Sequence, residues 1–142
     1  MKILYTAHAT ATNGGRGGGH SATDNGKVSV NLSVPKEMGG DGGAGTNPEE
    51  LFATGYAACF LGAMHVAAGR DKQKLPEGTT VAAKVSFADR QDGIGFTAVP
   101  ELTAHIPGYD KAKAEALVQK AHAICPYSNL ITVAHEVKLN VA

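Results

Sequence analysis

The amino-acid sequence predicts an α+β fold with a mainly antiparallel sheet. Short segments in which apolar residues recur at every second position are typical of strands, and two longer segments have the spacing of helices. They follow one another in the order strand, strand, helix, strand, strand, helix, strand, which suits such a fold. The chain has 142 residues and shows no internal repeat or linker, so residues 1–142 are expected to form a single domain.

Two strands are predicted in the N-terminal part, at residues 3–12 and 27–34, and the second alternates apolar residues with serine and asparagine. The turn between them, residues 13–20, is dense in glycine and contains one arginine, Arg16. Because glycine has no side chain, the backbone around Arg16 can approach another surface closely. A second glycine-rich loop, residues 39–45, precedes the first helix.

The first helix is predicted to run from Pro48 to about Gly69. Thr46 or Asn47 can cap it, and the two glutamates after Pro48 favour the positive end of the helix dipole. One stripe of this helix consists of Phe52, Tyr56, Cys59, Ala63 and Val66. Small residues occupy the other faces, which indicates a buried helix, so Cys59 is expected to be shielded from water.

The remaining predicted elements are strands at residues 80–89 and 95–106, a helix at residues 111–124 and a last strand at residues 135–141. Asp92-Gly93 between the middle strands is a strong hairpin signal. Asp110 caps the second helix, and Pro126 is expected to end it.

Charge and composition argue against two classes of protein. The chain has 13 basic and 13 acidic side chains, whereas nucleic-acid binders carry an excess of basic residues. Its apolar N-terminal run is too short for a signal peptide, and polar residues and glycines interrupt its most apolar stretch, residues 51–68. We therefore expect a cytoplasmic protein with no nucleic-acid or membrane partner, in which a permanent structural disulfide is unfavourable.

Cys59 and Cys125 are the only cysteines, and they lie too far apart in sequence for a CxxC redox motif or a zinc knuckle. A thiol reacts as its thiolate, which burial disfavours, so a reactive Cys59 needs a cation nearby. Arg16 can supply that cation, and Glu49 can hold its guanidinium. Cys125 lies at a helix C-terminus, where the dipole disfavours a thiolate, so it is better suited to resolve an oxidised partner.

These residues also have ordinary structural explanations. Arg16 can be a solvated turn residue, and both cysteines can be inert buried side chains. The six histidines show no HxxxH or HxH spacing, so no metal site is predicted. The glycines of residues 39–45 match a dinucleotide fingerprint by letter only, because no acidic residue ends a strand further on.

Three motifs have a more specific counterpart. They are Gly14-Gly15-Arg16, the block GTNPEELFATGYAACF at residues 45–60, and Cys125-Pro126-Tyr127-Ser128-Asn129. Together they resemble the motifs of the organic hydroperoxide resistance proteins (Ohr), a branch of the OsmC/Ohr family. Glu50 stands where glutamine is usual in that family, which leaves open whether Glu49 or Glu50 pairs with Arg16.

The resemblance implies an OsmC-like fold, with mainly antiparallel sheets wrapped around two long central helices in an intertwined homodimer. It implies a peroxidase that reduces organic hydroperoxides, alkyl and fatty-acid hydroperoxides among them, to alcohols. Cys59 matches the peroxidatic thiol, Cys125 the resolving thiol, and Arg16 with Glu49 the activating pair. The cycle would pass through a sulfenic acid and a Cys59–Cys125 disulfide. Lipoylated proteins are the family's reductants, so an external lipoyl-type dithiol and no bound cofactor are expected.

Phe96 and Tyr127 are the candidates for an apolar wall of the substrate pocket, because they lie near the matched motifs. A rival hypothesis is a redox-sensing or small-molecule-binding protein of the same fold that does not sustain turnover. Continued peroxide consumption with a dithiol reductant distinguishes the two.

Overall fold

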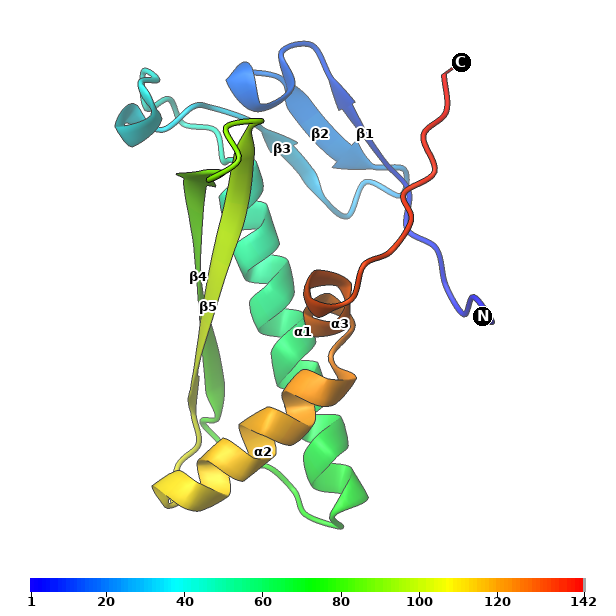
Figure 1. Cartoon of the computed structure of the whole chain (residues 1–142), viewed down its shortest axis with the longest axis vertical. Helices are drawn as coiled ribbons and strands as arrows, with labels where there is room; N and C mark the ends of the chain where they lie inside the picture. Colours follow the sequence, from blue (N-terminus) through cyan, green and yellow to red (C-terminus); the bar gives the residue numbers. More distant parts are fainter. Residues whose placement is uncertain (142) are drawn as a thin grey trace. The chain divides into compact units, whose positions relative to one another are not determined.

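The computed structural model describes residues 1–141 and divides into two compact units, residues 1–51 and residues from 52 onward. Helix α1, Pro48–Arg70, contains the boundary, so its first turn belongs to the first unit and the rest to the second. Both units are visible in Figure 1. The structure contains three α-helices and antiparallel sheets among its described residues, so the α+β prediction is confirmed.

The first unit contains a three-stranded antiparallel sheet in the order β1-β2-β3. Its elements are β1 (Ala9–Thr12), η1 (Gly15–Gly17), β2 (His20–Thr23), β3 (Ser29–Asn31) and η2 (Lys36–Met38). The strands predicted at residues 3–12 and 27–34 are therefore present but shorter. Strand β2 was not predicted, because it has no alternation of large apolar side chains.

The glycine-dense turn between β1 and β2 folds tightly onto itself. A side chain at Gly19 would lie 2.2 Å from the backbone oxygen of Thr12, so only glycine fits there. The Gly19 N–H donates to the Gly15 oxygen at 2.8 Å, which closes the loop. Arg16 is thereby held on the short helical turn η1.

The second unit combines most of α1 with a long hairpin and two further helices. Its elements are β4 (Thr80–Asp89), β5 (Phe96–His105), α2 (Lys111–Ile124) and α3 (Pro126–Thr132). The hairpin register pairs Thr80 with His105 and Asp89 with Phe96. The predicted hairpin and second helix are confirmed, and the Asp110 side chain caps α2 by accepting from the N–H of Lys113 at 2.8 Å.

The C-terminal part differs from the prediction in two places. Pro126 does not merely end α2, because it also begins α3, where proline suits the first helical position. The strand predicted at residues 135–141 is wrong for the single chain, since these residues form no regular structure. Val137, Leu139 and Val141 alternate as in a strand but are exposed. A strand needs a neighbour to satisfy its backbone, and none pairs with this segment in the described chain.

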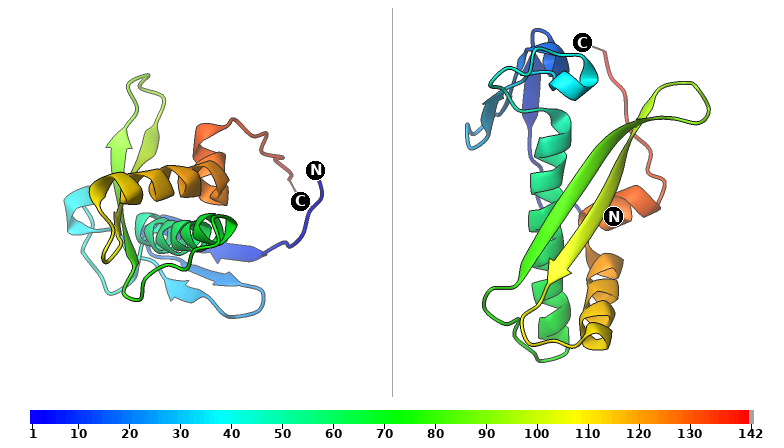
Figure 2. Two further views of the ribbon diagram at one scale, coloured as in Figure 1. Left: turned by 90° about the horizontal axis from the view of Figure 1, so that it is seen from below. Right: turned by 90° about the vertical axis from the view of Figure 1, so that its left-hand side faces the viewer.

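The core of the second unit lies between α1, α2 and the hairpin (Figure 2). Tyr56, Phe60 and Met64 contribute from α1, and Leu117 and Ala121 from α2. Partly buried hairpin side chains, Leu102 among them, pack against this cluster. Burial of large apolar side chains stabilises a fold by about 1.5–3 kcal/mol each. The apolar contact between α1 and α2 therefore fixes the position of α2 on α1.

The prediction that α1 is buried on every side is wrong in part. Ala58, Gly62 and Val66 lie on a face of the helix that is exposed in the single chain. Helix α1 is also long and apolar enough to pass for a membrane span. Core helices of globular proteins often pass the same test, and the buried residues of α1 belong to the core of the second unit.

Candidate thiol site

The two cysteines, far apart in sequence, lie in contact within the second unit. The Cys125 thiol donates to the Cys59 sulfur across 3.5 Å, and both cysteines are free. This distance is a contact between reduced sulfur atoms, since a disulfide bond measures about 2.05 Å. Cys59 is half-buried on α1, whereas Cys125 is fully buried at the junction of α2 and α3.

The surroundings of Cys59 do not by themselves favour its thiolate. Burial raises the pKa of Cys59, a hydrogen bond from the Tyr127 backbone N–H lowers it, and the Cys125 thiol raises it again. The pKa of Cys59 therefore lies above its ordinary value. This agrees with the argument from sequence that a reactive Cys59 needs a cation.

Arg16 and Glu49 form a bidentate ion pair within the first unit. Nη1 of Arg16 donates to Oε2 of Glu49 at 2.8 Å, and Nη2 donates to Oε1 at 2.7 Å. The hydrogen bond from Arg16 lowers the pKa of Glu49, and the hydrogen bond to Glu49 raises the pKa of Arg16. Both side chains are therefore charged at neutral pH.

The start of α1 orients Glu49 and leaves Glu50 another partner. The Asn47 side chain caps the helix by accepting from the Glu50 N–H at 2.9 Å, so Asn47 is the cap and Thr46 is not. The Thr46 backbone N–H donates to the Asn31 oxygen at 2.9 Å, which ties the helix start to β3. The Glu50 carboxylate accepts from the Thr46 hydroxyl. The sequence left open which glutamate pairs with Arg16, and the structure shows that Glu49 does.

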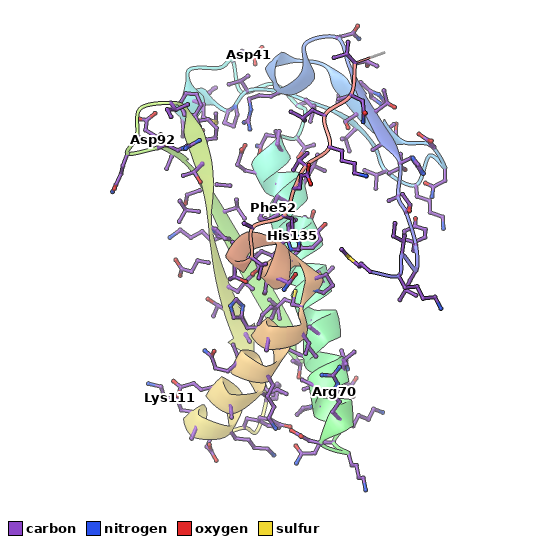
Figure 3. All side chains as sticks on the ribbon, turned by 45° about the vertical axis from the view of Figure 1, so that its right-hand side comes forward. Asp41, Phe52, Arg70, Asp92, Lys111 and His135 are labelled. Carbon is purple, nitrogen blue, oxygen red and sulfur yellow. The ribbon has the colours of Figure 1, made fainter. Side chains whose placement is uncertain are left out.

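Tyr127 packs into an aromatic cluster on α1. Its ring stacks on Phe52 with centroids 5.6 Å apart and lies 5.8 Å from the Tyr56 ring. Figure 3 shows Phe52 on α1 beside α3. A side chain at Gly55 would lie 2.9 Å from the Tyr127 hydroxyl oxygen, so the missing side chain makes room for the ring. Cys59 and Tyr127 both pack against the same core cluster.

Phe96 has different surroundings from Tyr127. It lies at the start of β5, stacks on Phe87 with centroids 4.6 Å apart, and is 61% exposed. It is not among the residues packed against the core cluster that holds Cys59. Cys59 and Tyr127 therefore share one cluster that does not include Phe96, and the substrate-binding roles of Tyr127 and Phe96 both stay predictions.

Sequence reasoning placed Phe52 and Tyr56 on one helix stripe with Cys59 but gave them no role at the site. Their spacing was a usable signal, because residues three and four positions apart share a helix face. The partners that they find on α3 could not be inferred from spacing within α1. Among residues 1–141, no group of three or more histidine, cysteine or acidic side chains could hold a metal ion.

Comparison with known proteins gives consistent matches over most of the chain. Residues 39–141 match the family model described as OsmC-like protein. The organic hydroperoxide resistance protein of Xanthomonas axonopodis pv. citri (strain 306) is 50% identical over 141 residues, covering 99% of this chain and 96% of the relative.

Two solved structures are similar in fold and sequence. That of an organic hydroperoxide resistance protein from Legionella pneumophila has a TM-score of 0.84 and 45% identity, covering 92% of both chains. That of OhrB from Bacillus subtilis has a TM-score of 0.82 and 36% identity, covering 92% of this chain and 93% of the other. Sequence and fold comparisons therefore agree on one family.

Proposed function

Because the chain belongs to the organic hydroperoxide resistance branch of the OsmC/Ohr family, we propose that it is a cysteine-based peroxidase that reduces organic hydroperoxides to alcohols. The observation that carries the proposal is the 3.5 Å contact between the Cys59 and Cys125 sulfur atoms. One thiol is half-buried and the other fully buried. A peroxide can approach the first, while the second is in place to resolve its oxidised form.

In the proposed cycle the Cys59 thiolate attacks the distal oxygen of the hydroperoxide. The oxygen–oxygen bond breaks, the alkoxide takes a proton and leaves as the alcohol, and Cys59 becomes a sulfenic acid. The Cys125 sulfur then attacks the Cys59 sulfur, which forms the disulfide and releases water. An external dithiol of the dihydrolipoyl type restores both thiols by two exchange steps and becomes a disulfide itself, so no bound cofactor takes part.

Arg16 and Glu49 are proposed to activate Cys59. Burial and the neighbouring thiol raise the pKa of Cys59, so an added positive charge is needed to favour the thiolate at neutral pH. The guanidinium of Arg16 is fixed by two hydrogen bonds to Glu49. We propose that this guanidinium supplies the positive charge.

The substrate class is proposed from the apolar surroundings of the thiol. The rings of Tyr127, Phe52 and Tyr56 pack together, and Cys59 packs against the same core cluster. Such a wall favours peroxides with an alkyl group, such as alkyl and fatty-acid hydroperoxides, over hydrogen peroxide, because it buries apolar surface of the substrate. Phe96 remains a candidate for the same wall.

The active form is proposed to be an intertwined homodimer in the cytoplasm, with the two copies of α1 at its centre. Large apolar side chains are exposed at both ends of the chain, Ile3, Leu4, Tyr5, Val137, Leu139 and Val141 among them. Val66 is also exposed on the open face of α1. A second copy would cover these surfaces and could supply partners for the segment at residues 135–141.

The first test is the intact mass of reduced protein after one equivalent of an alkyl hydroperoxide, measured without reductant. We expect a loss of two hydrogen atoms per chain and a linked peptide pair that contains Cys59 and Cys125. An unchanged mass would overturn the peroxidase proposal. Sustained peroxide consumption with dihydrolipoamide, a small dithiol, would then exclude a sensor that is oxidised only once.

A further inference from the structure

A buried hydrogen bond joins two hydroxyl groups that the proposed cycle does not use. The Tyr56 hydroxyl on α1 and the Ser128 hydroxyl on α3 lie 2.9 Å apart. Tyr56 is only 4% exposed and Ser128 only 1%. Water cannot compete for a bond at this depth, so each hydroxyl depends on the other for a partner.

This bond lies next to the sulfur contact in both helices. Tyr56 precedes Cys59 by three residues on α1, and Ser128 follows Cys125 by three residues at the start of α3. Residues three apart in a helix lie on the same side. The hydroxyl pair and the thiol pair are therefore neighbouring links between α1 and the start of α3.

The start of α3 carries both groups that act directly on Cys59. Cys125 immediately precedes the helix, and the Tyr127 backbone N–H acts on Cys59 by lowering its pKa. Helix α3 has only seven residues, so its own backbone bonds hold its position weakly. A hydrogen bond made by Ser128, the residue after Tyr127, would therefore control where the Cys125 sulfur and the Tyr127 N–H point.

The ring of Tyr56 is itself held in place. It contacts the Phe60 ring edge-on at 6.3 Å between centroids and the Phe52 ring at 5.7 Å. Its hydroxyl therefore has a fixed direction, and a phenylalanine at this position would keep the ring packing while losing the hydrogen bond. Besides Cys59, the titratable side chains of this cluster are Tyr56, Tyr109, Cys125 and Tyr127, and the Cys125 sulfur lies 3.5 Å from the Cys59 sulfur.

We infer that Tyr56 and Ser128 are positioning residues for the thiol chemistry: their hydrogen bond holds the start of α3 against α1, so that the Cys125 sulfur and the Tyr127 N–H both face Cys59. Neither residue touches the reacting oxygen. The inference rests on the proposed function for its catalytic meaning, but the positioning of Cys59 can be measured without any peroxide.

The test compares Tyr56→Phe, Ser128→Ala and the double variant with a matched control, Tyr109→Phe. Tyr109 donates its hydroxyl to Gln73 at the surface, at 3.3 Å, so the control removes a tyrosine hydroxyl away from the thiols. Two properties are measured in the full chain: the pH midpoint of Cys59 alkylation in reduced protein, and the rate of Cys59–Cys125 disulfide formation after addition of an alkyl hydroperoxide.

We expect the alkylation midpoint to rise by about half a pH unit in each single variant, because a displaced Tyr127 N–H would lower the pKa of Cys59 less. The rate of disulfide formation should fall by about tenfold, as expected when a reacting group is displaced. The double variant should have no higher alkylation midpoint and no slower disulfide formation than either single variant, because both substitutions break the same bond. The control should match the unmodified protein.

Unchanged midpoints and rates in folded Tyr56→Phe and Ser128→Ala would overturn the inference. Additive losses in the double variant would overturn it as well, since they would mean that each residue acts by itself. If Tyr56→Phe does not fold, the result for Ser128→Ala tests the inference by itself, because this variant keeps every aromatic ring. Failure of the unmodified protein to form the disulfide would count against the proposed function, while the alkylation midpoints would still test the positioning.

Discussion

Arg16 and Glu49 are joined by two parallel hydrogen bonds of 2.8 and 2.7 Å, although 33 residues separate them in the sequence. One lies on a glycine-flanked turn and the other on the first turn of α1. The carboxylate fixes the plane of the guanidinium, and a fixed guanidinium is better suited to a thiolate than a mobile one.

Glu49→Gln should make the protein less stable by about 0.5–1 kcal/mol at pH 7, a modest value because Arg16 is partly exposed to water. The pKa of Glu49 is lowered in the folded protein, from an ordinary value of 4.5. The stabilisation is thus complete above that pH and is lost as the pH falls through the lower folded pKa. Urea unfolding at pH 7 and in mild acid measures this. Glu50→Gln is the control, and an equal effect there would contradict the assignment of Glu49.

Arg16→Ala should raise the pH midpoint of Cys59 alkylation, because the thiolate would lose the positive charge that is proposed to activate it. Arg16→Lys should restore that midpoint only in part, since lysine cannot form the planar bidentate contact with Glu49. Mass spectrometry of the alkylated Cys59 peptide over a pH series provides the measurement. Arg90→Ala, in the hairpin turn, is the control, and an unchanged midpoint in Arg16→Ala would remove Arg16 from the mechanism.

Cys59→Ser should abolish peroxide reduction, because no thiolate remains to attack the peroxide. Cys125→Ser should still release one alcohol per chain and then stop, with Cys59 left as a sulfenic acid or oxidised further. Alcohol release quantified by chromatography distinguishes these results. Normal recycling of Cys125→Ser by a lipoyl dithiol would contradict the resolving role of Cys125.

Gly55→Ala should displace the Tyr127 ring, since the added carbon would lie 2.9 Å from the Tyr127 hydroxyl oxygen. We expect a higher KM for alkyl hydroperoxides in steady-state assays. Gly69→Ala is the matched control on the same helix, because nothing lies within 4 Å of its added carbon. This control should be stabilised by up to about 1 kcal/mol, the helix preference of alanine over glycine. An equal KM in both variants would contradict the proposed pocket wall.

Local signals in the sequence predicted most of the fold. The Asp-Gly turn, the Asp110 cap and the proline at the start of α1 each depend on residues within a few positions, and the structure confirms all three elements. Strand β2 was missed because its backbone pairs on both sides while its side chains give no apolar alternation. The alternation at residues 135–141 predicted a strand, but alternation does not show whether a partner strand exists within the same chain.

The sequence predicted which residues form the candidate site better than it predicted how they are arranged. Residue types and family motifs indicated the two cysteines, Arg16 and Glu49. The 3.5 Å sulfur contact and the Tyr56–Ser128 bond depend on how α3 packs on α1. Helix α3 was itself missed, because a proline after a helix was interpreted only as a stop. The single-domain prediction for residues 1–142 stays a prediction.

Because Cys125 is buried, a thiol assay of the native protein should not detect both cysteines. A bulky, water-soluble reagent added to the native, reduced chain should label only the half-buried Cys59, and both cysteines should react after denaturation. A native count of one is therefore no sign of partial oxidation. Redox titrations should quench and unfold the sample before labelling, because otherwise fully reduced protein would be scored as half oxidised.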